Sequence, residues 1–136
     1  MSRVSTSAAK PDVAGVVNYS EVYIFAEDAV AGSGSHTANL LAIPANARVL
    51  RGAADIEEAF DAGTTNVLIV GDEDDDDHFL AAGDVNEAAT GVTAFASNTP
   101  KRYTAAKTLK AKYSYTGTAP TIGRARVWCE WVRLGE

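Results

Sequence analysis

Hydrophobic and polar residues alternate with a period of two in several short stretches of the chain, as they do in half-buried β-strands. Residues 108–115 (TLKAKYSY) and 123–134 (GRARVWCEWVRL) alternate most clearly. Each of these strands would place one set of side chains toward the protein interior and the other set toward solvent. The predicted inward set is Leu109, Ala111, Tyr113 and Tyr115 in the first strand, and Ala125, Val127, Cys129 and Trp131 in the second.

Further short segments are rich in β-branched and aromatic residues and are bounded by polar or turn-forming residues, so they also predict strands. Pro44 ends one of them, because proline removes a backbone hydrogen-bond donor. These segments are residues 21–26, 39–43, 66–71 and 91–96. Two glycine-containing segments between them are predicted as connections: residues 26–39 as a loop, and residues 79–91 as a loop or a short irregular helix.

Residues 47–60 (ARVLRGAADIEEAF) carry two conflicting patterns. Ile56, Ala59 and Phe60 have helical spacing, whereas the flanking glycines and the shortness of each apolar piece favour a strand. We predict a strand. The next residues, 61–65, are turn formers, so the natural expectation is a hairpin around Gly63 that joins this strand to the one at 66–71.

These segments amount to seven or eight short strands with little sustained helical periodicity. Such a pattern predicts an all-β fold, either an antiparallel β-sandwich or a small barrel. Residues 1–18 are mostly small and polar and have no apolar periodicity, so we expect a flexible N-terminal arm. The 136-residue length then leaves residues 19–136 as a single β-sandwich domain.

Composition limits the class of protein. Of the 46% apolar residues, 25 are alanines, which add little core volume. Cys129 is the single cysteine, so no intrachain disulfide or Cys-x-x-Cys motif can form, and we expect synthesis in a reducing compartment. The sequence has neither the layout of a signal peptide nor an apolar run near the roughly 20 residues of a membrane helix. We therefore expect no membrane association.

The formal charge of −6 is unevenly distributed. Residues 1–100 carry 4 basic and 16 acidic side chains (4 − 16 = −12), and residues 101–136 carry 8 basic and 2 acidic ones (8 − 2 = +6). The fold either turns this separation into an acidic and a basic face, which favours ordered association with other surfaces or with further copies, or it mixes the charges. Nucleic-acid binding is disfavoured, because the overall sign is wrong and no nucleic-acid motif is present.

Six consecutive acids, Asp72 to Asp77, are the densest charge in the chain. Carboxylates are suitable ligands for calcium or magnesium, but the spacing does not fit a calcium loop. Counted from Asp72, position six is Asp77 where glycine is needed, and position twelve is Gly83 where glutamate is needed. We expect a solvated turn and no dedicated metal site, with adventitious divalent-cation binding as the alternative.

No catalytic arrangement is recognisable in the sequence. His36 and His78 each lack a second histidine at ligand spacing, although the neighbouring carboxylates make His78 a candidate proton-responsive residue. Cys129 falls on the predicted inward face, where a thiol behaves as a small hydrophobic group. The segment AGSGSH (residues 31–36) lacks the ending of a phosphate loop and the spacing of a dinucleotide fingerprint. We predict no catalytic residue, no metal and no cofactor.

Trp128 is the most informative candidate for binding. The alternation that sends Cys129 inward sends Trp128 outward, together with Arg124 and Arg126. Tryptophan and arginine are enriched at the centres of protein interfaces, so these three residues form a predicted protein interface. The alternative is that a second sheet or a loop covers the tryptophan.

Residues 44–80 (PANARVLRGAADIEEAFDAGTTNVLIVGDEDDDDHFL) resemble small structural proteins of tailed bacteriophages, and the closing GRARVWCEWVRL is similar to their final strand. This broad group includes the capsid decoration proteins, also called cement proteins. The resemblance implies a jelly-roll-like β-sandwich and a non-enzymatic virion protein that binds the outer capsid surface as a homodimer or homotrimer. The implied partners are the major capsid protein and further copies of the chain.

A receptor- or glycan-binding module of a phage fibre or adhesin is the alternative on the same architecture. Sugar sites often display aromatic rings on an open surface. The residues available for such a site are Tyr103, Tyr113, Tyr115 and Trp128.

Overall fold

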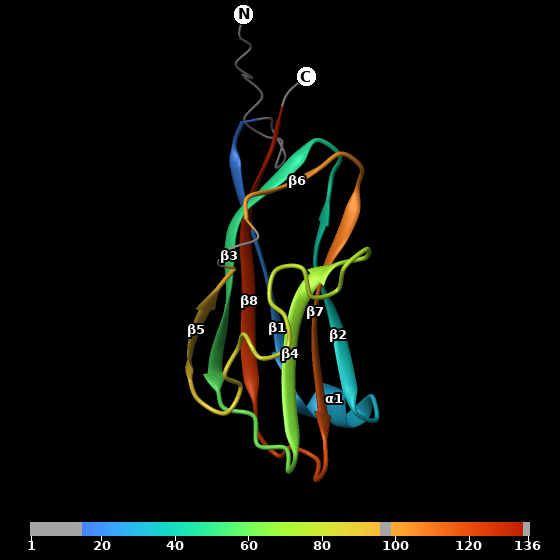
Figure 1. The fold of residues 1–136 in the computed structure, drawn as a ribbon, viewed down its shortest axis with the longest axis vertical. Helices are drawn as coiled ribbons and strands as arrows, with labels where there is room; N and C mark the ends of the chain where they lie inside the picture. The colour runs from blue at the N-terminus through green and yellow to red at the C-terminus, as the bar shows by residue number, and fades with distance from the viewer. Residues whose placement is uncertain (1–14, 96–98, 135–136) are drawn as a thin grey trace, which may run out of the picture.

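The computed structural model describes residues 15–95 and 99–134. The chain folds into two antiparallel β-sheets that pack face to face, which confirms the predicted all-β sandwich (Figure 1). The five-stranded sheet has the order β1 (Val17–Phe25), β8 (Arg124–Arg133), β3 (Ala47–Glu58), β5 (Gly91–Ala94), with β6 (Lys101–Tyr103) also paired to β3. The three-stranded sheet has the order β2 (Ser35–Ile43), β7 (Lys107–Thr116), β4 (Thr65–Asp72).

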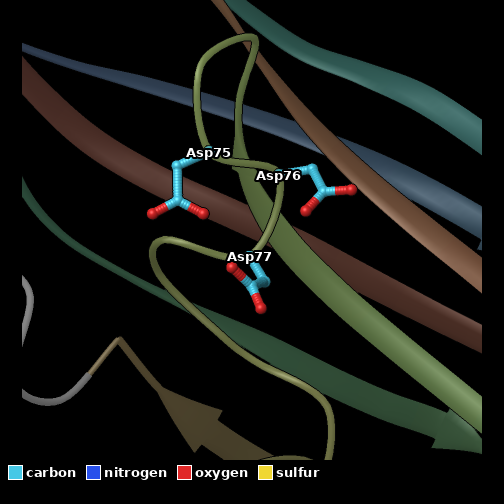
Figure 2. Close-up of side chains that lie close together, drawn as sticks. All are labelled: Asp75, Asp76 and Asp77. Atoms are coloured by element: carbon cyan, nitrogen blue, oxygen red, sulfur yellow. The ribbon is translucent and has the colours of Figure 1, made fainter.

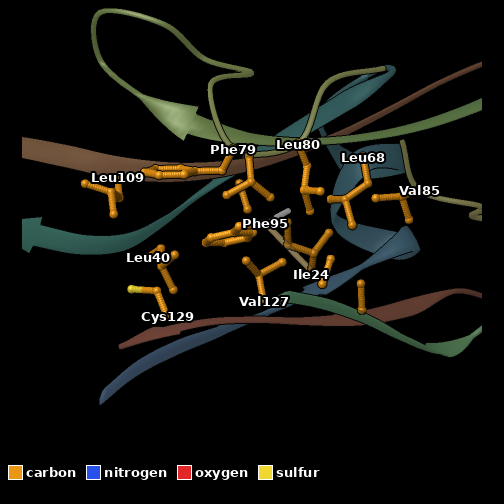
Figure 3. Close-up of a cluster of buried hydrophobic side chains, with 14 of the residues drawn as sticks. Ile24, Leu40, Leu68, Phe79, Leu80, Val85, Phe95, Leu109, Val127 and Cys129 are labelled. Atoms are coloured by element: carbon orange, nitrogen blue, oxygen red, sulfur yellow. The ribbon is translucent and has the colours of Figure 1, made fainter. Parts of the chain in front are cut away.

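The core lies between the sheets and is built by the alternation seen in the sequence (Figure 3). Leu109, Ala111 and Tyr113 of β7 are buried, and Tyr115 packs partly buried against them, as predicted. In β8 the predicted inward residues Ala125, Val127, Cys129 and Trp131 are likewise buried. Since β7 and β8 are the central strands of their sheets, their inward residues form the middle of the core.

The long connection between β4 and β5 is anchored in this core. Phe79, Leu80 and Val85 are its large apolar side chains, and all three are buried. Leu80 also forms a short bridge to Val70 of β4. This connection therefore packs against the sandwich although most of its residues are acidic, small or glycine.

Residues 47–58 form a strand and not a helix, as predicted. β3 is bordered by β8 along one side and by β5 and β6 along the other, so tertiary pairing satisfies its backbone on both sides. The helical spacing that ends at Phe60 has a different cause: Ile56 lies on the inward face of β3, and Phe60 enters the core just after the strand has ended.

The predicted hairpin around Gly63 is wrong. β3 and β4 lie in different sheets, and the connection between them crosses from one layer to the other. The backbone amide of Gly63 donates to the carbonyl of Thr118, and that of Thr64 donates to Thr116, so this turn pairs with the β7–β8 connection. Turn residues allow the chain to reverse, but they do not determine which strand becomes the neighbour.

The other differences concern element boundaries. Residues 26–31 of the predicted loop form a short helix, α1 (Ala26–Ala31), and β2 begins at Ser35, four residues before the predicted start. Pairing with β7 extends β2 over these polar residues. β6 was not predicted, and the turn expected at residues 98–101 lies partly outside the described residues. Within the described ranges α1 is the only helix, and its six residues are far too few to cross a membrane.

Candidate functional site

An outward-facing row of apolar side chains follows β1, the edge strand of the five-stranded sheet. Val17 and Tyr19 are more than half exposed, and Tyr23 and Phe25 are about 40% exposed. The rings of Tyr23 and Phe25 stack with their centroids 6.0 Å apart. We call these four residues, together with Trp128 of β8, the outer aromatic face.

Trp128 points to the outside of the sandwich, as the alternation predicts, and no second layer covers it in the described part of the chain. It stacks on Tyr19 with ring centroids 6.0 Å apart and lies opposite Glu21 and Ala53 in the strand register. Tyr19 in turn donates a hydrogen bond of 2.7 Å to Glu21. The tryptophan is therefore partly buried by neighbours in its own sheet and held in one orientation.

Arg124 and Arg126 lie on the same face but are not free charges. Arg124 Nε is 2.9 Å from a carboxylate oxygen of Glu57, and Arg126 lies between Glu21 (3.5 Å) and Glu57 (3.7 Å). These acids come from β1 and β3, the strands on either side of β8. Here folding mixes the charges that the sequence separates, so this side of the molecule combines aromatic rings with neutralised ion pairs.

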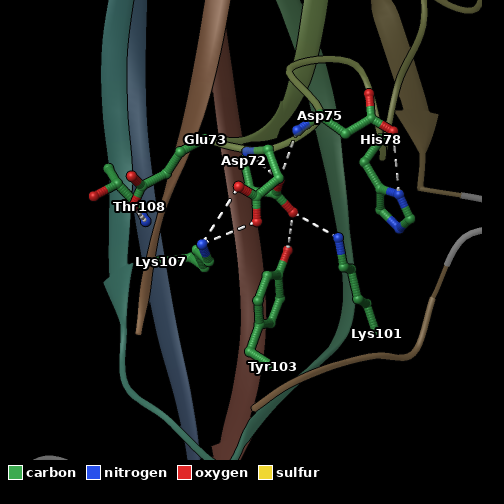
Figure 4. A network of polar contacts seen from close by, with 9 residues as sticks. Asp72, Glu73, Asp75, His78, Lys101, Tyr103, Lys107 and Thr108 are labelled. Atoms are coloured by element: carbon green, nitrogen blue, oxygen red, sulfur yellow. Dashed lines mark hydrogen bonds and ion pairs between the residues drawn. The ribbon is translucent and has the colours of Figure 1, made fainter. Parts of the chain in front are cut away.

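The six consecutive acids from Asp72 to Asp77, which we call the acid run, divide into a buried beginning and an exposed end. The expectation of a wholly solvated turn is wrong for Asp72, which is buried and lies in a network of polar contacts that Figure 4 shows. Its carboxylate accepts hydrogen bonds from Lys101 Nζ and from the Tyr103 hydroxyl, each at 2.7 Å. It also accepts from the backbone amides of Asp74 and Asp75, at 3.0 and 2.9 Å.

Burial by itself would raise the pKa of Asp72, but these four hydrogen bonds outweigh it and lower the pKa to about 2. Burial raises the pKa of Tyr103, and the hydrogen bond that its hydroxyl donates to Asp72 raises it further. Asp72 therefore joins the end of β4 to β6, in the opposite sheet, and acts as a structural anchor.

The next two acids attach the run to the start of β7. Glu73 accepts a 2.8 Å hydrogen bond from the backbone amide of Thr108, and Asp74 forms an ion pair of 3.0 Å with Lys107 (Figure 4). Both contacts are near the surface, where an ion pair contributes only about 0–1 kcal/mol. Their main effect is to position the rest of the loop.

The remaining acids are exposed. We call Asp75, Asp76 and Asp77 the acid tip; carboxylate oxygens of the three lie within 4.8 Å of one another (Figure 2). The neighbouring carboxylate of Asp75 raises the pKa of Asp77. His78 Nδ1 is 3.7 Å from an oxygen of Asp75, so the predicted proton-responsive role of His78 has a partner in reach and stays a prediction. An exposed trio of like charges lacks the enclosing oxygen ligands of a calcium site.

The other sequence candidates have structural positions. Burial raises the pKa of the Cys129 thiol to about 12, which leaves it protonated and unreactive at neutral pH. Tyr103 and Tyr113 are buried, so they cannot form part of the open glycan-binding surface considered in the sequence analysis. Tyr115 is partly buried. Tyr113 donates a 2.6 Å hydrogen bond to Asn66 across the three-stranded sheet.

The exposed aromatic residues of β1 were missed as candidates. A signal was present in the sequence: residues 17–25 alternate, and Ile24 is buried while Tyr23 and Phe25 face outward. The predicted strand began only at residue 21, so the pattern was too short to separate the two faces.

Comparison with known proteins identifies the fold. No protein-family model and no curated protein sequence is similar to this chain. Three solved structures are similar, all from bacteriophage capsids. A chain in the acid-stable capsid structure of Helicobacter pylori bacteriophage KHP30 has a TM-score of 0.67 and 18% identity, over 90% of this chain and 92% of that one.

The other two similar chains belong to the capsid asymmetric unit of cyanophage Pam1 and to the capsid of Ralstonia phage GP4. The Pam1 chain has a TM-score of 0.66 and 15% identity, over 97% of this chain and 94% of that one. The GP4 chain has a TM-score of 0.63 and 20% identity, over 93% and 90%. All three therefore share the fold of this chain over at least 90% of both chains.

Proposed function

We propose that this chain is a non-enzymatic virion structural protein: a capsid decoration protein that binds the outside of a phage head and braces neighbouring capsomers. The observation that carries the proposal is the similarity, over at least 90% of both chains, to chains of three phage capsid structures. The resemblance of residues 44–80 to phage structural proteins supports it independently. A fold does not by itself define a function, so the binding surface must carry the rest of the argument.

The outer aromatic face, with Arg124 and Arg126 beside it, is the proposed capsid-binding surface. It presents large aromatic rings next to arginines, the residue types that dominate binding energy at protein interfaces. Because the arginines are already paired with acids, docking would not leave unpaired charges buried. A decoration protein needs only a modest affinity per copy, since many copies together stabilise the shell by mass action.

The decisive experiment counts this protein in purified particles of the phage that encodes it, by quantitative mass spectrometry against the major capsid protein. A copy number comparable to that of the capsid protein is expected. A few copies per particle would move the protein to a tail or fibre, and its absence from particles would overturn the virion assignment.

The binding surface is tested with heads that lack the protein. Trp128→Ala is expected to weaken attachment of the purified full chain at least about tenfold, in the range of an interface hot spot. Val30→Ala is the matched control, because Val30 is also an exposed apolar residue but lies on α1, which packs against β2 and β7 and is not part of the outer face of the five-stranded sheet. Equal attachment of both variants would exclude the outer aromatic face as the docking surface.

The predicted N-terminal arm, residues 1–18, is proposed as a second contact. Its last two residues, Val17 and Asn18, belong to β1, and residues 1–14 lie outside the described residues. Deleting residues 1–14 retains Gly15, whose amide donates to the carbonyl of Arg133 at 2.9 Å, so the body should stay folded. The truncated protein is expected to attach more weakly while its thermal unfolding is unchanged. Attachment equal to that of the full chain would show that the arm has no role in binding.

A further inference from the structure

The strands of the three-stranded sheet present basic side chains on their outer face and no acidic side chain of their own. These strands contain a single acidic residue, Asp72, and that side chain points inward. Lys110 and Lys112 of β7 point outward, because the residues alternating with them are buried. Within the described part of the chain neither lysine has an ion pair. A basic patch is therefore left unmatched on a molecule whose formal charge is −6.

The acid tip has the opposite imbalance. Asp72 and Asp74 are paired with lysines of their own chain, but Asp76 and Asp77 have no basic partner among the described residues. Asp75 has only His78. Three crowded carboxylates are thus exposed with almost no compensating charge, and any cationic surface that reaches them relieves their mutual repulsion.

Both charge groups lie on the same outer face. Gly71 is opposite Lys110 in the β4–β7 register, so the two residues share the outward side. A Cβ atom at Gly71 would lie 2.1 Å from the carbonyl oxygen of Asp75 and 2.4 Å from the carbonyl carbon of Asp76. The backbone of the acid tip therefore folds directly over this face. The face has a negative end at the tip and a positive centre at the two lysines.

We propose that this face binds a second copy of the chain, with the acid tip of each copy against Lys110 and Lys112 of the other. A surface with a negative end and a positive centre is complementary to itself when the two copies are related by a twofold axis. Every contact then occurs twice, and the unmatched charges of both copies are neutralised together. The acid tip of one copy is the anionic group that pairs with the two lysines of the other copy.

This surface lies on the sheet opposite to the outer aromatic face, so the proposal does not depend on capsid attachment. If the aromatic face binds capsomers, a dimer joined in this way carries two such faces and becomes a bivalent bridge.

Sedimentation equilibrium of the purified full chain tests the proposal. The wild type is expected to dimerise at about 50 mM salt and to dissociate toward monomer at about 500 mM, where charge is screened over a few ångströms. Lys110→Glu/Lys112→Glu and Asp75→Lys/Asp76→Lys/Asp77→Lys are each expected to be monomeric. An equimolar mixture of these two variants is expected to regain the dimer, since each restores the charge that the other has reversed.

Two matched controls reverse exposed charges elsewhere: Arg102→Glu on β6 and Glu27→Lys on α1. Both are expected to dimerise like the wild type, and circular dichroism confirms folding of every variant. A monomeric wild type at low salt, dimerisation of either reversed variant alone, or a mixture that stays monomeric would overturn the proposal.

Loss of the dimer in Trp128→Ala would instead assign self-association to the outer aromatic face. A monomeric protein that still binds heads would overturn this inference only, and a dimer that does not bind them would overturn only the proposed function.

Discussion

Asp72 is the first of six consecutive acids, yet its carboxylate is buried while the last three acids are exposed. The difference comes from β6, whose Lys101 and Tyr103 reach it from the other sheet. Asp72→Asn is expected to lower the free energy of unfolding at pH 7 by about 2 kcal/mol, because the pKa of about 2 lies below the ordinary value of 3.8. Urea unfolding measures this change. Asp76→Asn, at an exposed position, is expected to change it by less than about 0.5 kcal/mol.

The same lowered pKa predicts a pH dependence. Asp72 contributes stability that is complete above the unfolded pKa of 3.8 and is lost as the pH falls toward the folded pKa of about 2. The stability difference between the wild type and Asp72→Asn should therefore shrink between about pH 5 and pH 2. Burial raises the pKa of Glu87, which acts in the opposite sense, but Glu87 is present in both proteins and cancels in the difference. A difference that stays constant over this range would contradict the anchoring role of Asp72.

At the scale of elements, the connection after β4 depends on Gly71. Any side chain there would meet the backbone of Asp75 and Asp76, so Gly71→Ala is expected to displace the acid tip and to cost about 1–3 kcal/mol, the usual range for overpacking. The backbone amide of Asp72, which donates to Asp75 at 2.9 Å, should exchange its hydrogen faster. Asp76→Ala leaves the strand untouched and serves as the control. Unchanged stability and exchange in Gly71→Ala would refute this packing.

Element identity was largely predictable, but element pairing was not. The alternation in β7 and β8 identified their buried faces residue by residue, because a strand in a sandwich has one face in the core. The turn at Gly63 was also recognised, but the expected hairpin partner was wrong, because backbone hydrogen bonds to Thr116 and Thr118 direct the chain into the other sheet. Strand pairing depends on contacts far apart in the sequence, which local patterns do not encode.

At the scale of the whole molecule, the proposed function predicts an effect on the capsid shell. Adding the protein to heads that lack it is expected to raise the temperature at which they release DNA, because a ligand that binds only the intact shell stabilises it by mass action. A fluorescent DNA-binding dye measures the release. The Trp128→Ala variant, at the same concentration, is expected to give a smaller increase. Heads that open at the same temperature with and without the wild type would exclude a bracing role.

The sequence alone determined the all-β class, the inward and outward faces of the central strands, and the outward position of Trp128, because alternation reports directly on burial. The tertiary structure decided how the charges are distributed. It pairs Arg124 and Arg126 with acids from neighbouring strands, buries Asp72 against the opposite sheet, and leaves Lys110 and Lys112 unmatched beside the acid tip. These outcomes depend on which strands become neighbours. Electrostatic neutralisation acts through space between residues up to about a hundred positions apart, as between Glu21 and Arg126.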